Sequence, residues 1–329
     1  MPQLRVVSFG LGPIGSEIAR TASGRAGVEV VAAVDVDPAK IGRTVREVAG
    51  ADCDVLIASS LGEALSGVEA DAALHSTGSS LAGVCGQLSQ ALEAGLNVVS
   101  TCEELAYPWR TNAALAQELD ELARAKGVRL LGAGVNPGFV MDALPLVLTA
   151  ACQRVDKVEI SRVVDAANRR GPLQRKVGAG RSPAEFDALA ESGAVRHVGL
   201  AESAWMLIDA LGWEVEEWEE TLSPVVAERD TDAGETPIVA GQAAGVHQTI
   251  RVRHNGVERL AMDLQMYVGA ESPHDRVQIE GVPNLDVRIE CGVHGDRATA
   301  AIVVNSLQAM GAARTGLLTM VDLLTVHAR

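Results

Sequence analysis

The stretch Leu4–Gly15, LRVVSFGLGPIG, decides the fold of this chain. Its first half is an apolar run of strand type, and its second half combines the glycine pattern GxGxxG with the start of a helical pattern. A strand, a tight glycine turn and a helix in this order form the corner of a nucleotide-binding fold that holds a diphosphate on the helix N-terminus. The residues that we predict to bind a dinucleotide here are Gly10, Gly12, Pro13, Ile14 and Gly15.

The second strand pattern ends at Asp35, roughly 20 residues after the glycine turn, where an acidic residue hydrogen-bonds the adenosine ribose. A carboxylate at this position favours NAD because it accepts a hydrogen bond from the ribose 2′-hydroxyl. Lys40 and Arg43 follow in the same loop, and either cation can pair with the 2′-phosphate of NADP or simply lie on the surface. The sequence therefore predicts NADP or NAD as cofactor and leaves the choice open.

The same strand and helix alternation continues to about residue 150, which predicts a Rossmann domain over residues 1–150 with a mostly parallel sheet. After residue 150 the pattern changes to long strands, two of them joined by Asn255-Gly256. We predict a second α+β domain over residues 151–295, built on a mainly antiparallel sheet, with helices near Pro183–Ala190 and His197–Leu211. The tail, about 296–329, is expected to be helical and to pack on the first domain.

Composition excludes several classes of protein. The 329 residues include 47% hydrophobic residues, which is enough for two packed cores, and the formal charge of −15 opposes binding to nucleic acid or to an anionic membrane. The longest apolar stretches, such as Ala143–Cys152, are too short to span a bilayer, and no signal peptide pattern opens the chain. Five scattered cysteines have no metal-ligand spacing, so we expect no metal site and a cytoplasmic protein.

Two further strands of the first domain end in polar loops. Ser76, Thr77 and Gly78 follow one strand, and we expect them beside the cofactor because ligands bind at the carboxyl ends of parallel strands. Glu103 and Glu104 follow the next strand, where a partly desolvated carboxylate can exchange protons with a substrate. The alternative is that one glutamate caps a helix and the other is solvated. We predict at least one catalytic glutamate in this pair.

The loop after the next strand contains Asn136-Pro137-Gly138, which brings backbone close to a ligand or forms an ordinary helix-start turn. We assign Asn136 and Pro137 to cofactor binding. Aromatic residues make up only 3% of the chain, yet three of them fall in this loop and the preceding one, which suggests an apolar wall over the nicotinamide. The predicted substrate pocket consists of Tyr107, Trp109, Phe139, Val140 and His197, although His197 fits a packing role equally well.

Motifs for hydrolases, kinases and zinc proteases are absent from the sequence, which leaves hydride transfer as the predicted chemistry. The segments VSFGLGPIG, VDVDPAKIGR, HSTGSS, STCEELAYP, GAGVNPGFVMD, RHVGLAES and GDRATAAIVVNSL occur in this order. With them the chain resembles, over nearly its full length, the 2,4-diaminopentanoate dehydrogenase and amine dehydrogenase family, a branch related to dihydrodipicolinate reductase. The resemblance implies NAD(P)-dependent, reversible deamination of an amine to a carbonyl compound and ammonia, with a catalytic glutamate between Cys102 and Leu105.

The resemblance leaves the substrate open. A diamino acid needs a cation for its carboxylate, whereas a plain amine or ketone does not. The candidate cations are Arg162, Arg169, Arg170 and Arg175. The alternatives are 2,4-diaminopentanoate dehydrogenase proper, a dihydrodipicolinate reductase-like enzyme, a homoserine or diaminopimelate dehydrogenase-like enzyme, and a redox sensor that binds NAD(P) without chemistry. Long strands in the second domain need covering, which predicts a homodimer.

Overall fold

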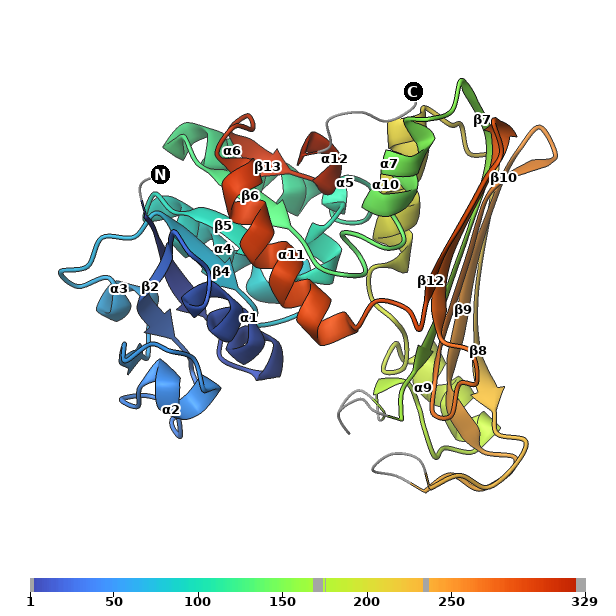
Figure 1. Ribbon diagram of the computed structural model, residues 1–329, viewed down its shortest axis with the longest axis horizontal. Helices are drawn as coiled ribbons and strands as arrows, with labels where there is room; N and C mark the ends of the chain where they lie inside the picture. The colour runs from blue at the N-terminus through green and yellow to red at the C-terminus, as the bar shows by residue number, and fades with distance from the viewer. Residues whose placement is uncertain (1–2, 168–173, 175, 233–236, 324–329) are drawn as a thin grey trace. The chain divides into compact units, whose positions relative to one another are not determined.

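The computed structural model describes residues 3–167, 174, 176–232 and 237–323. Within them the chain divides into two compact units. The first runs up to Phe139 and resumes at His294, and the second spans Val140–Val293. Each unit is built around its own sheet (Figure 1).

The first unit has a parallel sheet of seven strands in the order β13-β6-β5-β4-β1-β2-β3. This is the doubly wound arrangement that the glycine corner predicts, because β1 lies inside the sheet and the chain winds outward from it in both directions, to β2 and β3 on one side and to β4, β5 and β6 on the other. The strands are β1 (Leu4–Phe9), β2 (Val28–Val34), β3 (Ile57–Ala58), β4 (Ala72–His75), β5 (Asn97–Ser100), β6 (Arg129–Gly132) and β13 (Gly316–Leu318).

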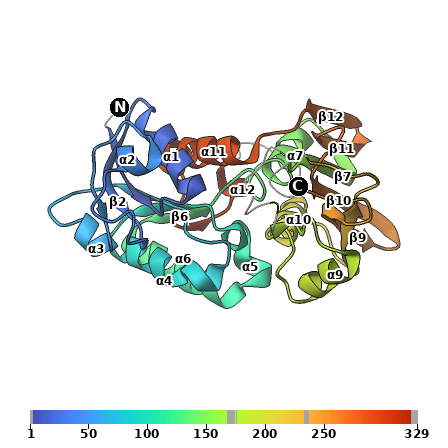
Figure 2. The ribbon, with the colours of Figure 1, turned by 90° about the horizontal axis from the view of Figure 1, so that it is seen from below.

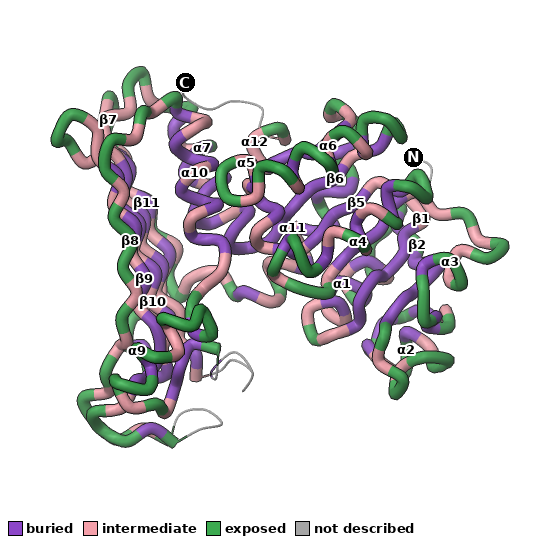
Figure 3. The backbone as a smooth tube through the Cα atoms, turned by 180° about the vertical axis from the view of Figure 1, so that it is seen from behind, coloured by how far each residue is buried: buried purple, intermediate pink, exposed green. Residues whose placement is uncertain are grey.

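Helices cover both faces of this sheet (Figure 2). Successive residues of each strand point to opposite faces, so Val6 packs under α1 and α11 whereas Val7 packs under α4 and α6. Figure 3 shows β5 and β6 as buried strands. The helices are α1 (Pro13–Ser23), α2 (Val45–Ala49), α3 (Leu61–Ala64), α4 (Leu81–Glu93), α5 (Pro108–Thr111), α6 (Ala113–Lys126), α11 (Gly295–Met310) and α12 (Met320–Leu323), with a 3₁₀ turn, η1 (Glu103–Leu105).

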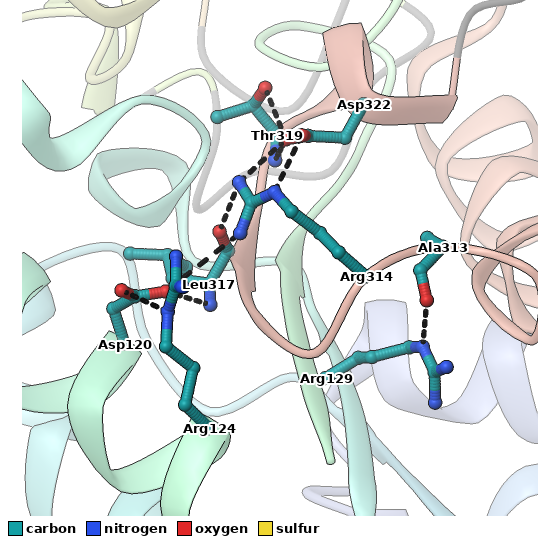
Figure 4. A network of polar contacts seen from close by, with 8 residues as sticks. All are labelled: Asp120, Arg124, Arg129, Ala313, Arg314, Leu317, Thr319 and Asp322. Carbon is teal, nitrogen blue, oxygen red and sulfur yellow. Dashed lines mark hydrogen bonds and ion pairs between the residues drawn. The ribbon is translucent and has the colours of Figure 1, made fainter. Parts of the chain in front are cut away.

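The tail confirms one expectation and corrects another. The helix α11 returns to the first unit, where Ala300, Val303 and Leu307 join its core. The chain then forms the strand β13, which adds to β6 and which we had predicted as helix. The strand is fixed by tertiary contacts: Asp120 accepts a hydrogen bond from the N–H of Leu317 at 2.8 Å and pairs with Arg124 at 2.7 Å (Figure 4). Such contacts between distant segments are not visible in a local sequence pattern.

The second unit has a six-stranded sheet in the order β12-β11-β7-β10-β9-β8. The prediction of a mainly antiparallel sheet is corrected here: the sheet is mixed, because β7 and β10 pair in parallel at its centre. The long segment between these two strands allows this pairing, and alternation of apolar residues is the same in both orientations. The strands are β7 (Arg154–Asp165), β8 (Glu217–Val226), β9 (Ala243–His254), β10 (Val257–Tyr267), β11 (His274–Val282) and β12 (Leu285–Glu290).

The helices of the second unit lie on one side of its sheet in Figures 1 and 2. They are α7 (Ala143–Thr149), α9 (Pro183–Glu191) and α10 (Leu200–Leu211). The helix α9 begins with a capping box between Ser182 and Glu185. The helix α10 starts at Leu200 rather than at His197, because Gly199 (φ 107°) adopts a left-handed conformation that stops a helix. The border between the units precedes α7, whereas the sequence suggested a border at residue 150.

The β9–β10 hairpin turns through Asn255 (φ 52°) and Gly256 (φ 68°), which confirms the predicted two-residue turn. No helix in the described part of the chain has the length and apolarity needed to cross a membrane.

Candidate active site

The three glycines of the first turn have two different structural tasks. Gly10 has φ +90°, and a Cβ atom there would approach the Ser76 carbonyl oxygen to 2.7 Å. At Gly15 a Cβ atom would collide with the carbonyl oxygen of Gly10 at 1.9 Å, whereas at Gly12 it would meet nothing within 4 Å. The first and third glycines therefore let the strand, turn and helix pack together, and the second leaves open space in front of the helix.

This space lies at the N-terminus of α1. Gly12 is the residue before the helix and Pro13 is its first residue, a position where the missing N–H of proline costs nothing. The N–H groups of the first turn have no acceptor within the helix, and the helix dipole places partial positive charge there. The predicted residues Gly12, Pro13, Ile14 and Gly15 thus form a surface suited to the diphosphate of a dinucleotide.

Asp35 lies at the carboxyl end of β2 and is only 7% exposed. Its Oδ2 accepts hydrogen bonds from the N–H of Leu11 at 2.8 Å and from Lys40 Nζ at 3.0 Å, while its Oδ1 accepts from the N–H of Asp37. Burial alone raises the pKa of the Asp35 carboxyl, but these donors outweigh it and lower the pKa below its usual value. Asp35 is therefore a fixed carboxylate that ties the glycine turn to the end of β2.

The two candidate cations differ. Lys40 lies against Asp35 and also within 3.6 Å of Asp37, so its ammonium stands at the edge of the expected ribose site. The Arg43 guanidinium is exposed and donates to the carbonyl of Glu47 at 3.4 Å. Val36, which sequence reasoning missed, follows Asp35 directly and is 75% exposed. An exposed valine beside the carboxylate that is expected to bind the ribose is suited to contact an adenine ring, and the only signal in the sequence is its position.

The loop after β4 touches the glycine turn. The Ser76 hydroxyl donates to the carbonyl of Gly10 at 3.0 Å, and the Ser76 N–H donates to the carbonyl of Phe9 at 2.8 Å. Thr77 and Gly78 are exposed at the same end of the sheet. The structure thus brings these three predicted residues next to the glycine turn.

The acidic pair forms η1 at the end of β5, and both glutamates are half-buried. Glu104 Oε2 accepts the N–H of Leu81, the first residue of α4, at 2.8 Å, and the Glu104 N–H donates to the carbonyl of Ser79. Cys102 Sγ also donates to Ser79, and burial raises the pKa of this thiol to about 12. The acidic loop is therefore fixed to the loop after β4. A glutamate does cap a helix, but it is α4, which precedes Glu104 in the chain.

The loop after β6 is buried at Asn136 and Pro137, and the peptide bond between them is cis. The Val135 N–H donates to the hydroxyl of Thr299 on α11 at 3.2 Å. Gly138 has φ +116°, and a Cβ atom there would meet the backbone of Gly134 at 2.5 Å. These contacts hold the loop at the same sheet edge as the acidic pair.

The predicted pocket residues are distributed over both units. Tyr107 and Trp109 lie at the start of α5, and Trp109 packs against the core beneath α4 and α6. Phe139 ends the first unit and is half-buried. Val140 and His197 belong to the second unit, where Val140 is buried and the His197 N–H donates to Gln248 Oε1 at 3.2 Å.

Arg162 is not placed to receive a substrate carboxylate. It is 3% exposed, and its guanidinium pairs with Asp275 Oδ1 at 2.5 Å and donates to the carbonyl of Val293 at 3.0 Å. Asp275 also accepts the Val293 N–H at 2.7 Å, so the ion pair is a structural clamp on the end of the second unit. Arg169, Arg170 and Arg175 lie outside the described residues. Among the described residues, no cluster of three potential metal ligands occurs.

A parallel strand followed by a glycine turn, a buried carboxylate at the end of the second strand and an acidic loop at the same sheet edge define a domain of the Rossmann class. Residues 139–329 match the family model described as 2,4-diaminopentanoate dehydrogenase C-terminal domain. The chain is 30% identical to 2,4-diaminopentanoate dehydrogenase of Acetoanaerobium sticklandii, with 98% of this chain and 94% of that protein covered. The chain belongs to the 2,4-diaminopentanoate dehydrogenase family.

Amine dehydrogenases are also similar to it. The enzyme of Streptomyces virginiae is 24% identical over 90% of this chain and 88% of that protein. The solved structure of the amine dehydrogenase of Mycobacterium smegmatis matches with a TM-score of 0.84 at 24% identity, covering 99% of this chain and 97% of that one. The resemblance seen in the sequence is confirmed. The chain is an NAD(P)-dependent oxidoreductase that acts on amines, which sets aside the redox sensor without chemistry.

Proposed function

We propose that the acidic loop Cys102–Leu105 supplies the carboxylate that handles ammonia and protons when this enzyme deaminates an amine or aminates a carbonyl compound. The observation that carries the proposal is the pair Glu103–Glu104 on η1, joined to the N-terminus of α4 through Glu104 and Leu81. A carboxylate fixed by its surroundings acts without first being oriented, which lowers the entropic part of the barrier.

The cofactor site of this proposal is the corner formed by β1, α1 and Asp35. The N–H groups at the start of α1 bind the diphosphate, the carboxylate of Asp35 orients the adenosine ribose, and the loop Ser76–Gly78 lies beside the second ribose. The nicotinamide, when bound, exchanges a hydride with the carbon that carries the amine.

The protein contributes proton transfer and binding. A glutamate carboxylate binds an ammonium ion by charge, takes a proton from it, and returns a proton to the oxygen that leaves as water. In the opposite direction it takes a proton from the water that attacks the iminium carbon. The aromatic residues Tyr107 and Phe139 shield the iminium from stray water, which would hydrolyse it before hydride arrives.

Single substitutions test the acidic pair. Glu103→Gln and Glu104→Gln remove one carboxylate each, while the glutamine amide oxygen at 104 still accepts the Leu81 N–H. We expect the variant that lacks the catalytic carboxylate to lose at least 1,000-fold in kcat, a typical scale for general acid–base catalysis combined with substrate charge, with cofactor affinity unchanged. Ammonia-dependent turnover at the wild-type rate by the variant that carries both Glu103→Gln and Glu104→Gln would contradict the proposal.

We further propose that Lys40 pairs with the 2′-phosphate of NADP, whereas Asp35 accepts a hydrogen bond from the ribose 2′-hydroxyl of NAD. A 2′-phosphate beside Asp35 needs a cation close by, and Lys40 Nζ is 3.0 Å from that carboxylate. We expect Lys40→Ala to raise the KM for NADPH by about 10-fold or more and to leave the KM for NADH within about 3-fold. Arg46→Ala, which removes a surface cation paired with Asp52 and Asp54, is the matched control. Equal effects of Lys40→Ala on both cofactors would contradict this assignment.

We propose a plain amine or ketone as substrate. Arg162 is engaged in a buried ion pair, so the described residues do not offer it to a substrate carboxylate. The alternative, 2,4-diaminopentanoate dehydrogenase proper, is favoured by the 30% identical relative. Cofactor oxidation with ammonia, plain ketones, aldehydes and 2-amino-4-oxopentanoate decides between them. Turnover of the amino-keto acid alone would establish the alternative.

We also propose that the protein is a cytoplasmic homodimer that uses the sheet of the second unit. The helices of the second unit lie on one side of this sheet. Lys157, which alternates along β7 with the buried Val158, pairs with Glu159 and Glu258. All five cysteines are free, which suits a reducing compartment. Light scattering of the purified protein tests the dimer, and a mass near 34.3 kDa would refute it.

A further inference from the structure

His75 is the last residue of β4 and is 1% exposed, so its imidazole does not reach solvent. In the sheet it lies between Phe9, the last residue of β1, and Ser100, the last residue of β5. The Phe9 ring packs edge-on against the imidazole, with 5.3 Å between the ring centres. The function argued above gives no role to this histidine, although it stands at the carboxyl ends of three central strands.

The hydrogen bonds of His75 define its tautomer. The Ser100 hydroxyl oxygen accepts the Cys102 N–H at 3.1 Å and lies 2.8 Å from His75 Nδ1. Gln87 Oε1 is a pure acceptor and lies 2.9 Å from His75 Nε2, so Nε2 carries the proton of the neutral ring. Nδ1 is then unprotonated and accepts a hydrogen bond from the Ser100 hydroxyl.

Thr77 closes the same network. Its hydroxyl lies 2.9 Å from His75 Nε2 and donates to Gln87 Oε1 at 2.5 Å. A continuous chain of hydrogen bonds thus runs from the Cys102 N–H through Ser100, His75 and Gln87 to Thr77. One end of the chain is the backbone of Cys102, which directly precedes the acidic pair. The other end is the exposed Thr77 in the loop after β4.

A protonated imidazole would reverse the Ser100 contact, because Nδ1–H would then donate to the Ser100 oxygen and the hydroxyl proton would need another acceptor. Burial lowers the pKa of His75, against a smaller raising effect of the hydrogen bond to Gln87, which keeps the ring neutral near pH 7. A buried neutral ring that gives both its nitrogens to fixed partners does not exchange protons with a substrate. Its contribution is geometric.

We propose that His75 is a positioning residue that sets the Thr77 loop and the Glu103–Glu104 loop relative to each other. The inference rests on the proposed function, which places the cofactor beside Thr77 and the catalytic carboxylate in η1. Through Nε2 the ring fixes the Thr77 side chain for the cofactor, and through Nδ1 and Ser100 it fixes the backbone at Cys102, from which the acidic pair extends.

Two substitutions separate the two ends of the network. The amide of His75→Asn reaches about as far as Nδ1 and keeps only the Ser100 contact, whereas the amide of His75→Gln reaches about as far as Nε2 and keeps only the Gln87 and Thr77 contacts. We expect His75→Asn to raise the cofactor KM about 10-fold with a smaller change in kcat. We expect His75→Gln to lower kcat about 10-fold with little change in the cofactor KM, and Ser100→Ala to do the same.

Leu74→Ala is the matched control because Leu74 is the neighbouring buried residue of β4 and faces the core. It lowers the thermal unfolding temperature and leaves kcat and KM within about 2-fold. Cofactor affinity is measured separately by quenching of tryptophan fluorescence with NADPH. If both His75 variants behave as Leu74→Ala does, the positioning role is refuted and the proposed function stands. If the double Glu103→Gln, Glu104→Gln variant keeps turnover, the proposed function fails, whatever the His75 variants show.

Discussion

At the scale of single residues, the glycine turn offers a direct contrast between packing and binding. A Cβ atom at Gly15 meets the backbone of Gly10 at 1.9 Å, and a Cβ atom at Gly12 meets open space. Gly15→Ala is therefore expected to lower the unfolding temperature by several degrees, the result of about 1–3 kcal/mol of overpacking. Gly12→Ala is expected to leave that temperature unchanged and to raise the KM for NAD(P)H at least 10-fold. Calorimetry and steady-state kinetics on both variants check this.

Unchanged cofactor KM in Gly12→Ala would show that the diphosphate does not approach this turn. Ala19→Gly, in the buried face of α1, provides the control for a change of one methyl group.

The placement of those candidate site residues that depends on local order was predictable from the sequence. The glycine turn and Asp35 occupy fixed places after β1 and β2, and the structure joins them through the Leu11 N–H. The tasks of Glu104 and Arg162 were not predictable, because their partners Leu81 and Asp275 are 23 and 113 residues away. The sequence shows that a residue is charged, but it does not show which distant group that residue binds.

At the scale of elements, the pairing of β9 with β10 makes stability depend on pH. Asp263 accepts a hydrogen bond from His247 at 3.0 Å, and this bond, against burial, raises the pKa of His247. The stabilisation is fully present below the unfolded-state pKa of about 6.5 and is lost as pH rises through the folded-state value. Burial raises the pKa of Asp263, but hydrogen bonds from His247 and Gln265 outweigh it and lower the pKa.

We therefore expect the advantage of the wild type over His247→Gln in unfolding temperature to be larger at pH 6 than at pH 9. Thermal unfolding followed by circular dichroism at several pH values measures this difference. His254→Gln serves as the control, since its partners Glu214 and Glu216 stand farther off, at 3.7 Å. A difference that grows with rising pH would contradict the assignment.

Elements with strong local signals were predicted, and elements that depend on distant partners were not. The hairpin at Asn255-Gly256 and the helix α9 follow from turn and capping residues. The strand β13 exists because β6 has an open edge and Asp120 binds the Leu317 N–H. The parallel pairing of β7 with β10 likewise depends on the path of the chain through the whole second unit. The alternation of apolar residues along a strand does not reveal that path.

At the scale of the whole molecule, the proposed cofactor residues from Gly10 to Pro137 all lie in the first unit. A ligand that binds the folded state raises the unfolding free energy of the unit that holds it, by about 2.7 kcal/mol at a concentration of 100 Kd. We therefore expect NADPH to slow amide hydrogen exchange most strongly at Leu11–Ser16, at Ser76–Leu81 and at Cys102–Leu105. The central strands β9 and β10 of the second unit are expected to change little by comparison.

Hydrogen exchange followed by mass spectrometry, with and without saturating NADPH, measures this distribution segment by segment. The Gly12→Ala variant at the same NADPH concentration is the control, because the added methyl group meets open space in the fold and is expected to fill the proposed diphosphate site. Protection that appears only within Val140–Val293 would place the cofactor in the second unit and overturn the assignment of the first unit as the dinucleotide-binding part. A further outcome is that NADPH protects Cys102–Leu105 in the wild type and not in His75→Gln. That result would show that His75 couples β4 to the acidic loop, and it requires no turnover, because amide exchange depends on hydrogen bonding.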